Sequence, residues 1–423
     1  MSSKSFQFIS TFSFSLCLQD FLNVMEKVFQ WSCLIGVVGS RRYICYLWST
    51  FLLLILLFVE VQAVWKVIKA LAGWAIDMAG QRSVTARLAG TIFYTISILS
   101  LILGSKLYRS WRHLTVLWAK VEWGLSVNAP VDKTLKRKMY IVIGVMTFCS
   151  MFEHIMSMIS SVGLDCPPSL IIKRYVLISH GFMILRHEYS DWYALPLAFI
   201  SCVASLLWNF QDQLIVLFSM GLSSRYRRLN QCLANVCALE KKQMDSDKKN
   251  EATNIYIWRK LREAYVKQAM LVRKVDESLG GIVLLSTFCN FYFICLQLFL
   301  GITQGNSSEP IKTVYNFVSL SWLCCRVIAV VLAASDINEL SRQALKHIYT
   351  YDSHCYNVEV ERLQYQLSKD YVALSGMGFF YLNKNILLQM AATIITYELV
   401  LIQFDDKGTD DVQLNLTKNA IGA

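Results

Sequence analysis

Seven apolar runs, each long enough to cross a lipid bilayer as a helix, dominate this sequence. Crossing the ~30 Å hydrocarbon core takes about 20 helical residues, and the backbone hydrogen bonds inside that core must be satisfied within the chain. We therefore predict an all-α membrane protein with seven transmembrane helices. The runs cover roughly residues 44–65, 88–108, 139–162, 192–222, 279–303, 313–335 and 383–404.

Composition argues against the main alternatives. Apolar residues make up 55% of the 423 residues and charged residues only 17%, whereas soluble domains carry about 25% charge. These figures disfavour a soluble two-domain enzyme. With 13% aromatic residues and only five prolines, the chain is also unlike a disordered protein.

Side-chain chemistry gives no sign of catalysis. The histidines lack a nucleophile at useful spacing, and the sequence contains no Gly-rich phosphate loop. The 13 cysteines lie mostly in apolar runs or in segments predicted to be cytoplasmic, so we expect no disulfide framework and no structural metal. We therefore predict that the protein is not an enzyme, needs no cofactor and does not bind nucleic acid.

Charge predicts which side of the membrane each connection faces. Connections on the side of the N-terminus hold 28 basic residues and those on the other side hold 10. The bias is moderate, since the connection 223–278 alone supplies 13 of them. Both glycosylation sequons, at Asn306 and Asn415, fall on the side with fewer basic residues. We expect the N-terminus inside and the C-terminus outside, with the net charge of +11 mainly facing the anionic inner leaflet.

The predicted spans divide the chain into seven regions. Apolar residues recur at helical spacing in the hydrophilic region 223–278, so we expect the fourth and fifth spans to continue into the cytoplasm as long helices. This extension would be either an oligomer anchor or a solvated hairpin. The regions are a cytoplasmic N-terminal segment 1–43, spans one to four in 44–222, the extension 223–278, spans five and six in 279–335, a cytoplasmic anchor region 336–382, the pore-lining helix 383–404 and an extracellular tail 405–423.

Polar residues follow one face of each of the third to sixth spans. Because such residues are costly in lipid, they face the protein interior or a water-filled space. Four polar, aromatic faces turned inward would enclose a cavity suited to a polyhydroxylated ligand. Alternatively, the serines serve helix packing, and Arg326 forms a buried ion pair with Glu153 or Asp212 that fixes the bundle. The candidate ligand-binding residues are Glu153, His154, Trp208, Asn209, Asp212, Asn290, Tyr315, Ser319 and Trp322.

The seventh span has a single polar stripe. Its residues lie within about 60° of one helical face, and Glu398 points the opposite way. Such a stripe is typical of a helix that lines a pore when several copies surround an axis. The alternative is a contact within the subunit, with Glu398 facing inward. The stripe comprises Gln389, Thr393, Thr396, Val400 and Gln403.

Several motifs resemble the insect gustatory receptors. Thr396 and Tyr397, followed after five residues by Gln403 and Phe404, resemble the signature that closes the last helix of that family. Further segments resemble its sugar-taste subfamily: Trp208–Asp212, Gly221–Arg225, Asn290–Ile294, Ala373–Phe380 and Ala392–Phe404. The chain departs from related sugar receptors at Gln213, Leu214, Arg227 and Arg228.

The resemblance implies a function as well as a fold. A homotetramer would surround a pore lined by the seventh helix and act as a sugar-gated, non-selective cation channel in the plasma membrane of a sensory neuron. Each subunit would bind a mono- or disaccharide in a pocket open to the outside, and other gustatory receptor subunits could join it. By this resemblance, the residues expected to form the pore and gate of this chain are Thr396, Tyr397, Val400, Gln403 and Phe404.

Three competing functions remain open at this point. A channel of the same family could be gated by a bitter compound, and its pocket would then be poor in carboxylates and amides. A metabotropic seven-helix receptor would need an external N-terminus and an Asp-Arg-Tyr motif after the third span. A secondary transporter would need broken helices in an inverted repeat.

Overall fold

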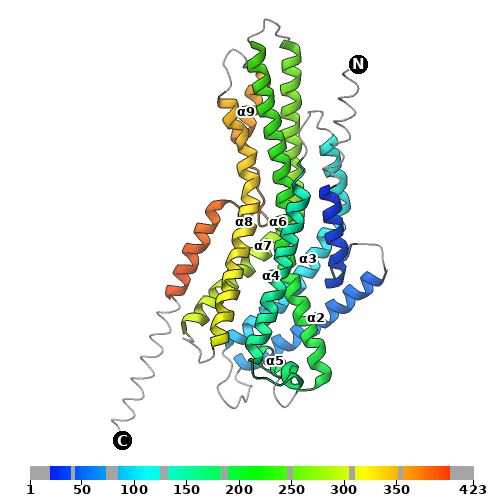
Figure 1. Cartoon of the computed structure of the whole chain (residues 1–423), viewed down its shortest axis with the longest axis vertical. Coiled ribbons are helices and arrows are strands. Elements are labelled where there is room, and N and C mark those ends of the chain that lie inside the picture. Colours follow the sequence, from blue (N-terminus) through cyan, green and yellow to red (C-terminus); the bar gives the residue numbers. More distant parts are fainter. Residues whose placement is uncertain are drawn as a thin grey trace, which may run out of the picture.

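The computed structural model describes residues 20–39, 43–72, 84–123, 132–181, 184, 189–244, 251–303, 310–350 and 356–400. Helices account for nearly all of these residues, and they form an elongated bundle (Figure 1). The helices are a first helix 20–32, α2 (Tyr43–Leu71), α3 (Val84–Trp123), α4 (Leu135–Val162), α5 (Ile171–Ser179), α6 (Asp191–Met244), α7 (Glu251–Thr303), α8 (Pro310–Tyr349), α9 (Val358–Lys369) and a last helix 384–400, with short 3₁₀ turns at Cys33–Ile35 and Pro168–Leu170.

Six of these helices, namely α2, α3, α4, α6, α7 and α8, are long and apolar enough to cross a membrane. They coincide with the first six predicted spans. The seventh predicted span is described as helix 384–400, and Gln403 and Phe404 lie outside the described residues. Its crossing of the membrane stays a prediction, and so do the sidedness and the use of the two sequons, since Asn306 and Asn415 are likewise outside the described part.

The fourth and fifth spans continue as long helices, as predicted. Helix α6 has 54 residues and α7 has 53, so each is about 80 Å long at 1.5 Å per residue, far more than a bilayer core requires. With α8 and α9 they form the narrow upper part of the molecule in Figure 1. This upper part is the end of the bundle that the charge distribution predicts to be cytoplasmic.

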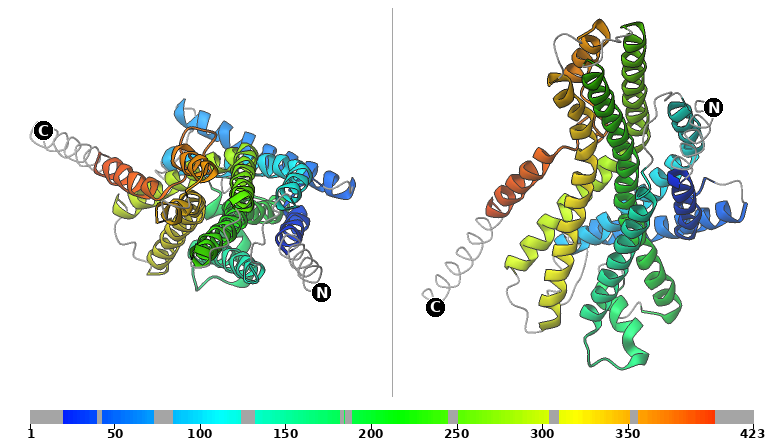
Figure 2. Two further views of the ribbon diagram at one scale, coloured as in Figure 1. Left: turned by 90° about the horizontal axis from the view of Figure 1, so that it is seen from above. Right: turned by 45° about the horizontal axis from the view of Figure 1, so that its top comes forward.

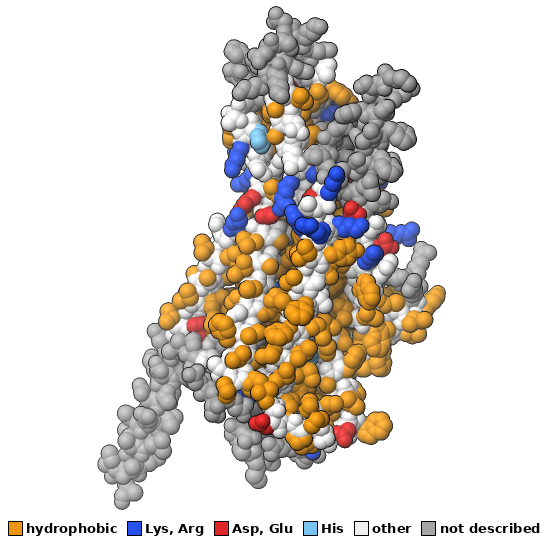
Figure 3. Space-filling view, viewed as in Figure 1, with side chains coloured by type: hydrophobic (Ala, Val, Ile, Leu, Met, Phe, Trp, Pro, Cys, Tyr) orange, Lys and Arg blue, Asp and Glu red, His pale blue; other side chains and the backbone are white. Residues whose placement is uncertain are grey.

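The surface divides into an apolar part and a charged belt. In Figure 3 apolar side chains cover the lower two thirds of the visible face, and Lys and Arg gather in a band across its upper edge. On α2, large apolar side chains such as Leu47 at 71% and Leu54 at 61% are also exposed. Such a surface fits a lipid environment, with the charged band at the boundary to water.

The N-terminal segment packs into the bundle through aromatic residues. Phe21 stacks on Trp118 of α3 with ring centroids 4.5 Å apart, and Phe29 stacks on Tyr108 at 4.6 Å. A side chain at Gly221 of α6 would collide with the Phe21 ring. Helix 20–32 is therefore held against α3 and α6 by its apolar face.

One cysteine expectation is wrong. The structure joins Cys33 to Cys45 by a disulfide whose Cα atoms are 6.1 Å apart. The chain turns back between them at Gly36, whose φ of 86° suits glycine. The sequence did not predict this disulfide because Cys45 belongs to an apolar run, where cysteine usually behaves as a small hydrophobic residue.

A tight turn holds the start of the last helix against α7. The backbone N–H of Ser375 donates to Asp276 at 2.6 Å, and its hydroxyl donates to the same carboxylate at 2.7 Å. A Cβ at Gly280 would approach the turn's backbone to 3.1 Å at Met377 N. The motif Ala373–Phe380 thus forms a compact connection between α9 and helix 384–400.

Candidate ligand-binding site

A cavity of about 300 Å³ lies among α3, α4, α5, α6, α7 and α8. It lies in the part of the bundle that is predicted to span the membrane, away from the extension that is predicted to be cytoplasmic. Polar and aromatic side chains line most of it. They include Glu153, His154 and Ser157 from α4, Ser201, Ser205 and Trp208 from α6, and Tyr315, Ser319, Trp322 and Arg326 from α8.

The cavity brings together six of the nine predicted ligand-binding residues. Glu153 and His154 of α4, Trp208 of α6, and Tyr315, Ser319 and Trp322 of α8 all line it. Residues three, four and seven positions apart share a face of a helix, which is why the polar stripes converge. The other three residues, Asn209, Asp212 and Asn290, are outside its lining.

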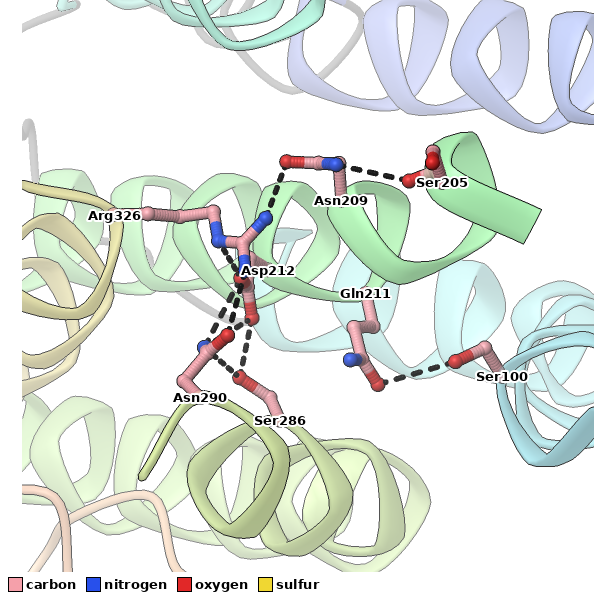
Figure 4. A network of polar contacts seen from close by, with 8 residues as sticks. All are labelled: Ser100, Ser205, Asn209, Gln211, Asp212, Ser286, Asn290 and Arg326. Atoms are coloured by element: carbon pink, nitrogen blue, oxygen red, sulfur yellow. Dashed lines mark hydrogen bonds and ion pairs between the residues drawn. The ribbon is translucent and has the colours of Figure 1, made fainter. Parts of the chain in front are cut away.

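These three residues surround Arg326, which itself lines the cavity (Figure 4). Arg326 Nε lies 2.7 Å from Asp212 Oδ2, and the two side chains are 2% and 0% exposed. The guanidinium also donates to the amide oxygens of Asn209 and Asn290. Ser286 and Asn290 donate to Asp212. Of the two ion pairs that the sequence allowed, the structure forms the one with Asp212.

Arg326 also forms part of the cavity wall. Its guanidinium carbon lies 4.5 Å from the centre of the Trp208 ring, at cation–π distance. Trp208 in turn packs on Phe293 of α7 with centroids 4.7 Å apart. The buried ion pair therefore sets the position of an aromatic face in the cavity.

A second set of hydrogen bonds crosses the cavity. Ser319 donates to Glu153 Oε1 at 2.9 Å and accepts from Gln297 Nε2 at 3.0 Å. Ser205 lies 3.2 Å from His154 Nδ1. Four helices, α4, α6, α7 and α8, are thus linked by side chains that border one space.

Several buried polar atoms on the cavity wall have no hydrogen-bond partner among the described residues, and three of them belong to uncharged side chains of α6, α7 and α8. These three are the indole nitrogens of Trp208 and Trp322 and Oε1 of Gln297. Unpaired buried groups of this kind cost about 1–3 kcal/mol each. A ligand with several hydroxyls would satisfy two donors and one acceptor while its C–H faces cover the rings.

Sequence reasoning missed the short helix α5. Tyr175, Ser179 and His180 lie in or just after it and line the cavity, together with Tyr94 of α3. The Tyr175 hydroxyl lies 3.1 Å from that of Ser201. Tyr175 and Val176 are buried within a connection otherwise rich in exposed residues. The apolar stretch 170–178 was the available signal, although it is too short to predict a span.

The polar stripe of the last helix is exposed on the single chain. Gln389, Thr393, Thr396 and Val400 are exposed, as is Tyr397, whereas Glu398 is 7% exposed and faces the subunit. Figure 2 shows this helix leaning away from the rest of the bundle. The stripe is thus available to another molecule or to a pore, and its role stays a prediction.

A metal or a catalytic centre finds no support in the described part of the chain. No group of three or more His, Cys, Asp or Glu side chains there could hold a metal ion. The side chains that line the cavity offer hydrogen bonds and aromatic contact to a ligand.

Comparison with known proteins places the chain among chemosensory receptors. A family described as trehalose receptor matches residues 10–413. Gustatory receptor 5a for trehalose of Drosophila melanogaster is 34% identical over 310 residues, which cover 71% of this chain and 66% of the relative. Gustatory receptor for sugar taste 64f of the same species is 32% identical over 326 residues, covering 74% and 65%. The match spans about two thirds of these relatives' length.

A solved structure has the same fold. The insect olfactory receptor OR5 from Machilis hrabei, determined in complex with eugenol, superimposes with a TM-score of 0.63. The match covers 91% of this chain and 100% of that one at 12% identity. This likeness shows a shared helical architecture.

Proposed function

The chain belongs to the trehalose receptor family of insect gustatory receptors, and from that premise we propose that it is a sugar-gated, non-selective cation channel. It would act in the plasma membrane of a sensory neuron as a homotetramer, alone or with other gustatory receptor subunits. Relatives named for sugar taste and for trehalose support a sugar as the ligand. A mono- or disaccharide would bind in the cavity between α4, α6, α7 and α8.

The unpaired groups of the cavity carry this proposal. Trp208, Trp322 and Gln297 offer two donors and one acceptor within one space, beside the carboxylate of Glu153. Binding a sugar would pair these groups, and the same site would penalise ligands that lack hydroxyls. A pocket for an apolar bitter compound would not need such groups, so we favour a sugar.

Asp212, Asn209 and Asn290 act through Arg326 in this scheme. They hold its guanidinium against Trp208, which presents the indole to the cavity. We therefore assign these three residues to positioning, and Glu153, His154, Trp208, Tyr315, Ser319 and Trp322 to direct contact.

Helix α7 provides a route from the cavity to the pore. Asn290, Phe293 and Gln297 lie at the network or the cavity, and Asp276, about four turns before Asn290 on the same helix, holds the turn before helix 384–400. A small shift of α7 on sugar binding would move this turn. The last helix would then displace Gln403 and Phe404, which close the pore that Thr396, Tyr397 and Val400 border.

Weak binding is enough for such gating. A tenfold preference of sugar for the open state contributes about 1.4 kcal/mol per site. Four coupled sites in a tetramer would shift the equilibrium by roughly 5–6 kcal/mol. A receptor for abundant sugars can therefore respond without high affinity.

Heterologous expression tests the proposal. In cells that lack taste receptors, whole-cell recording across a panel of sugars that includes trehalose should show cation current that needs no GTP. A current that disappears when GTP is withheld would instead indicate a metabotropic receptor.

A further inference from the structure

A second cavity lies along a face of α6 that adjoins the Arg326 network, at the surface of the bundle. It measures about 460 Å³ and runs between the N-terminal segment 24–35 and helices α4 and α6. Val28, Trp31, Ile143, Met146 and Phe210 contribute to its mainly apolar wall. Trp31 is 71% exposed and stands at its edge. We call this space the lateral groove.

A cluster of basic residues adjoins the lateral groove. Lys133, Lys136 and Arg137, just before and within the first turn of α4, line a surface depression together with Asp20. Asp20, the acidic residue of that lining, is paired with Lys136 at 3.0 Å. The depression therefore keeps a net positive charge. Tyr140 lines both spaces, so the two adjoin each other.

The two spaces have the dimensions of one lipid molecule in one leaflet. Arg137 lies in the basic cluster and Thr147 lies in the lateral groove, ten residues further along α4. At 1.5 Å per residue these positions are about 15 Å apart along the helix, half of the ~30 Å hydrocarbon core. A headgroup at the cluster would thus place its acyl chain beside Thr147.

We propose that the lateral groove and the basic cluster bind one anionic phospholipid from the leaflet that faces the charged belt. Its phosphate and headgroup lie against Lys133 and Arg137, and one acyl chain lies between Trp31 and α4. A soluble anion would leave the apolar wall bare, and a zwitterionic lipid would leave the positive charge uncompensated. Each Lys or Arg near an anionic surface contributes about 1 kcal/mol.

The groove also reaches the polar network of the bundle. Asn209 lines it at its inner end, and the amide oxygen of Asn209 accepts from Arg326. One side chain therefore separates the acyl chain from the residue that supports Trp208. The lipid site is distinct from the sugar cavity, and Asn209 connects it to Arg326, which lines that cavity.

Native mass spectrometry of the full-length chain in a neutral detergent tests the proposal. The probes are dioleoyl phosphatidylserine and dioleoyl phosphatidylcholine, counted as lipids retained per subunit. We expect one retained phosphatidylserine and about tenfold weaker retention of phosphatidylcholine. Lys133→Gln with Arg137→Gln should remove most of this preference, about tenfold or more for two charges.

Matched variants make the result specific. Arg342→Gln with Lys346→Gln removes two charges from α8 at the same end of the molecule, and Val145→Trp enlarges an exposed residue of α4 that is not in the groove lining. Both should leave lipid retention unchanged. Thr147→Trp fills the groove and should reduce phosphatidylserine retention at least fivefold, with an unchanged gel-filtration profile to show that the protein still folds.

Three results would overturn the proposal. Equal retention of the two lipids by the wild type would identify an ordinary lipid-facing surface. Retention that survives Thr147→Trp would place the lipid elsewhere or indicate that another segment, such as residues 1–19, fills the groove. If soluble glycerophosphoserine binds the protein as strongly as phosphatidylserine does, the acyl chain contributes nothing. The site would then be a plain anion site.

Discussion

Arg326 of α8 and Asp212 of α6 form an ion pair that is closed off from solvent, with Nε and Oδ2 2.7 Å apart. Two amide oxygens, from Asn209 and Asn290, accept from the remaining guanidinium nitrogens. Charges buried inside a helical bundle are tolerated only when they are paired in this way. It connects α6, α7 and α8 and positions the Trp208 ring.

The main effect of removing Asp212 should be a less stable receptor, with any effect on sugar recognition secondary to it. Asp212→Ala leaves the Arg326 charge buried and alone, which costs about 3–5 kcal/mol. We expect surface biotinylation to fall sharply. Adding Arg326→Met should restore much of it, because apolar residues can replace a buried pair at little cost. Normal surface levels and thermal stability for Asp212→Ala alone would show that the pair is dispensable.

The two indole nitrogens of the cavity should set sugar sensitivity. Trp208→Phe and Trp322→Phe keep the ring but remove one hydrogen bond each, worth about 0.5–1.5 kcal/mol. Each should raise the half-maximal sugar concentration by about two- to tenfold at unchanged surface expression. Trp192→Phe is the control, since Trp192 is 88% exposed at the start of α6. Equal dose-response curves for all three variants would remove these indoles from the site.

The turn at Ser375 should transmit the signal. Asp276→Ala removes the acceptor of both Ser375 hydrogen bonds and frees the start of helix 384–400. We expect altered basal current or a smaller maximal sugar response, with sugar sensitivity at the cavity less affected. Glu277→Ala is the adjacent control, because Glu277 pairs with Lys274 on the surface. Identical gating in the two variants would argue against this route.

The exposed stripe of the last helix should face the ion pathway. Cysteine at Thr396 should react with a charged methanethiosulfonate reagent, and the reaction should reduce sugar-evoked current. Ile395→Cys, on another exposed face of the same helix, should leave current unchanged after the same treatment. Gln403→Ala should alter conductance or leak. If the reagent reduced the current of Ile395→Cys but not that of Thr396→Cys, the Ile395 face of the helix would line the ion pathway and the polar stripe would not.

Helical periodicity made the main features of the cavity predictable. Polar residues are costly in lipid, so their spacing on four spans indicated which faces turn inward, and Glu153, Trp208 and Trp322 do border one space. Spacing could not show which carboxylate meets Arg326. Glu153 and Asp212 lie on different helices, and only the axial offset between those helices decides the partner.

Connections were less predictable than spans. Helix α5 brings Tyr175 and His180 to the cavity from a segment with no span-length periodicity. The Cys33–Cys45 disulfide depends on a turn at Gly36, and no sequence pattern predicted that turn. The unpaired nitrogens of Trp208 and Trp322 likewise follow from packing, because sequence reports the presence of a donor but not whether a partner reaches it.

Recording from excised outside-out patches in solutions without GTP tests the central claim most directly. With sugar applied to the outer face of the wild-type chain, we predict a cation current. The combined Trp208→Phe and Trp322→Phe variant should need at least about fourfold more sugar to give the same current. Wild-type patches that stay silent without GTP, or a double variant with an unshifted response, would contradict a channel gated from this cavity.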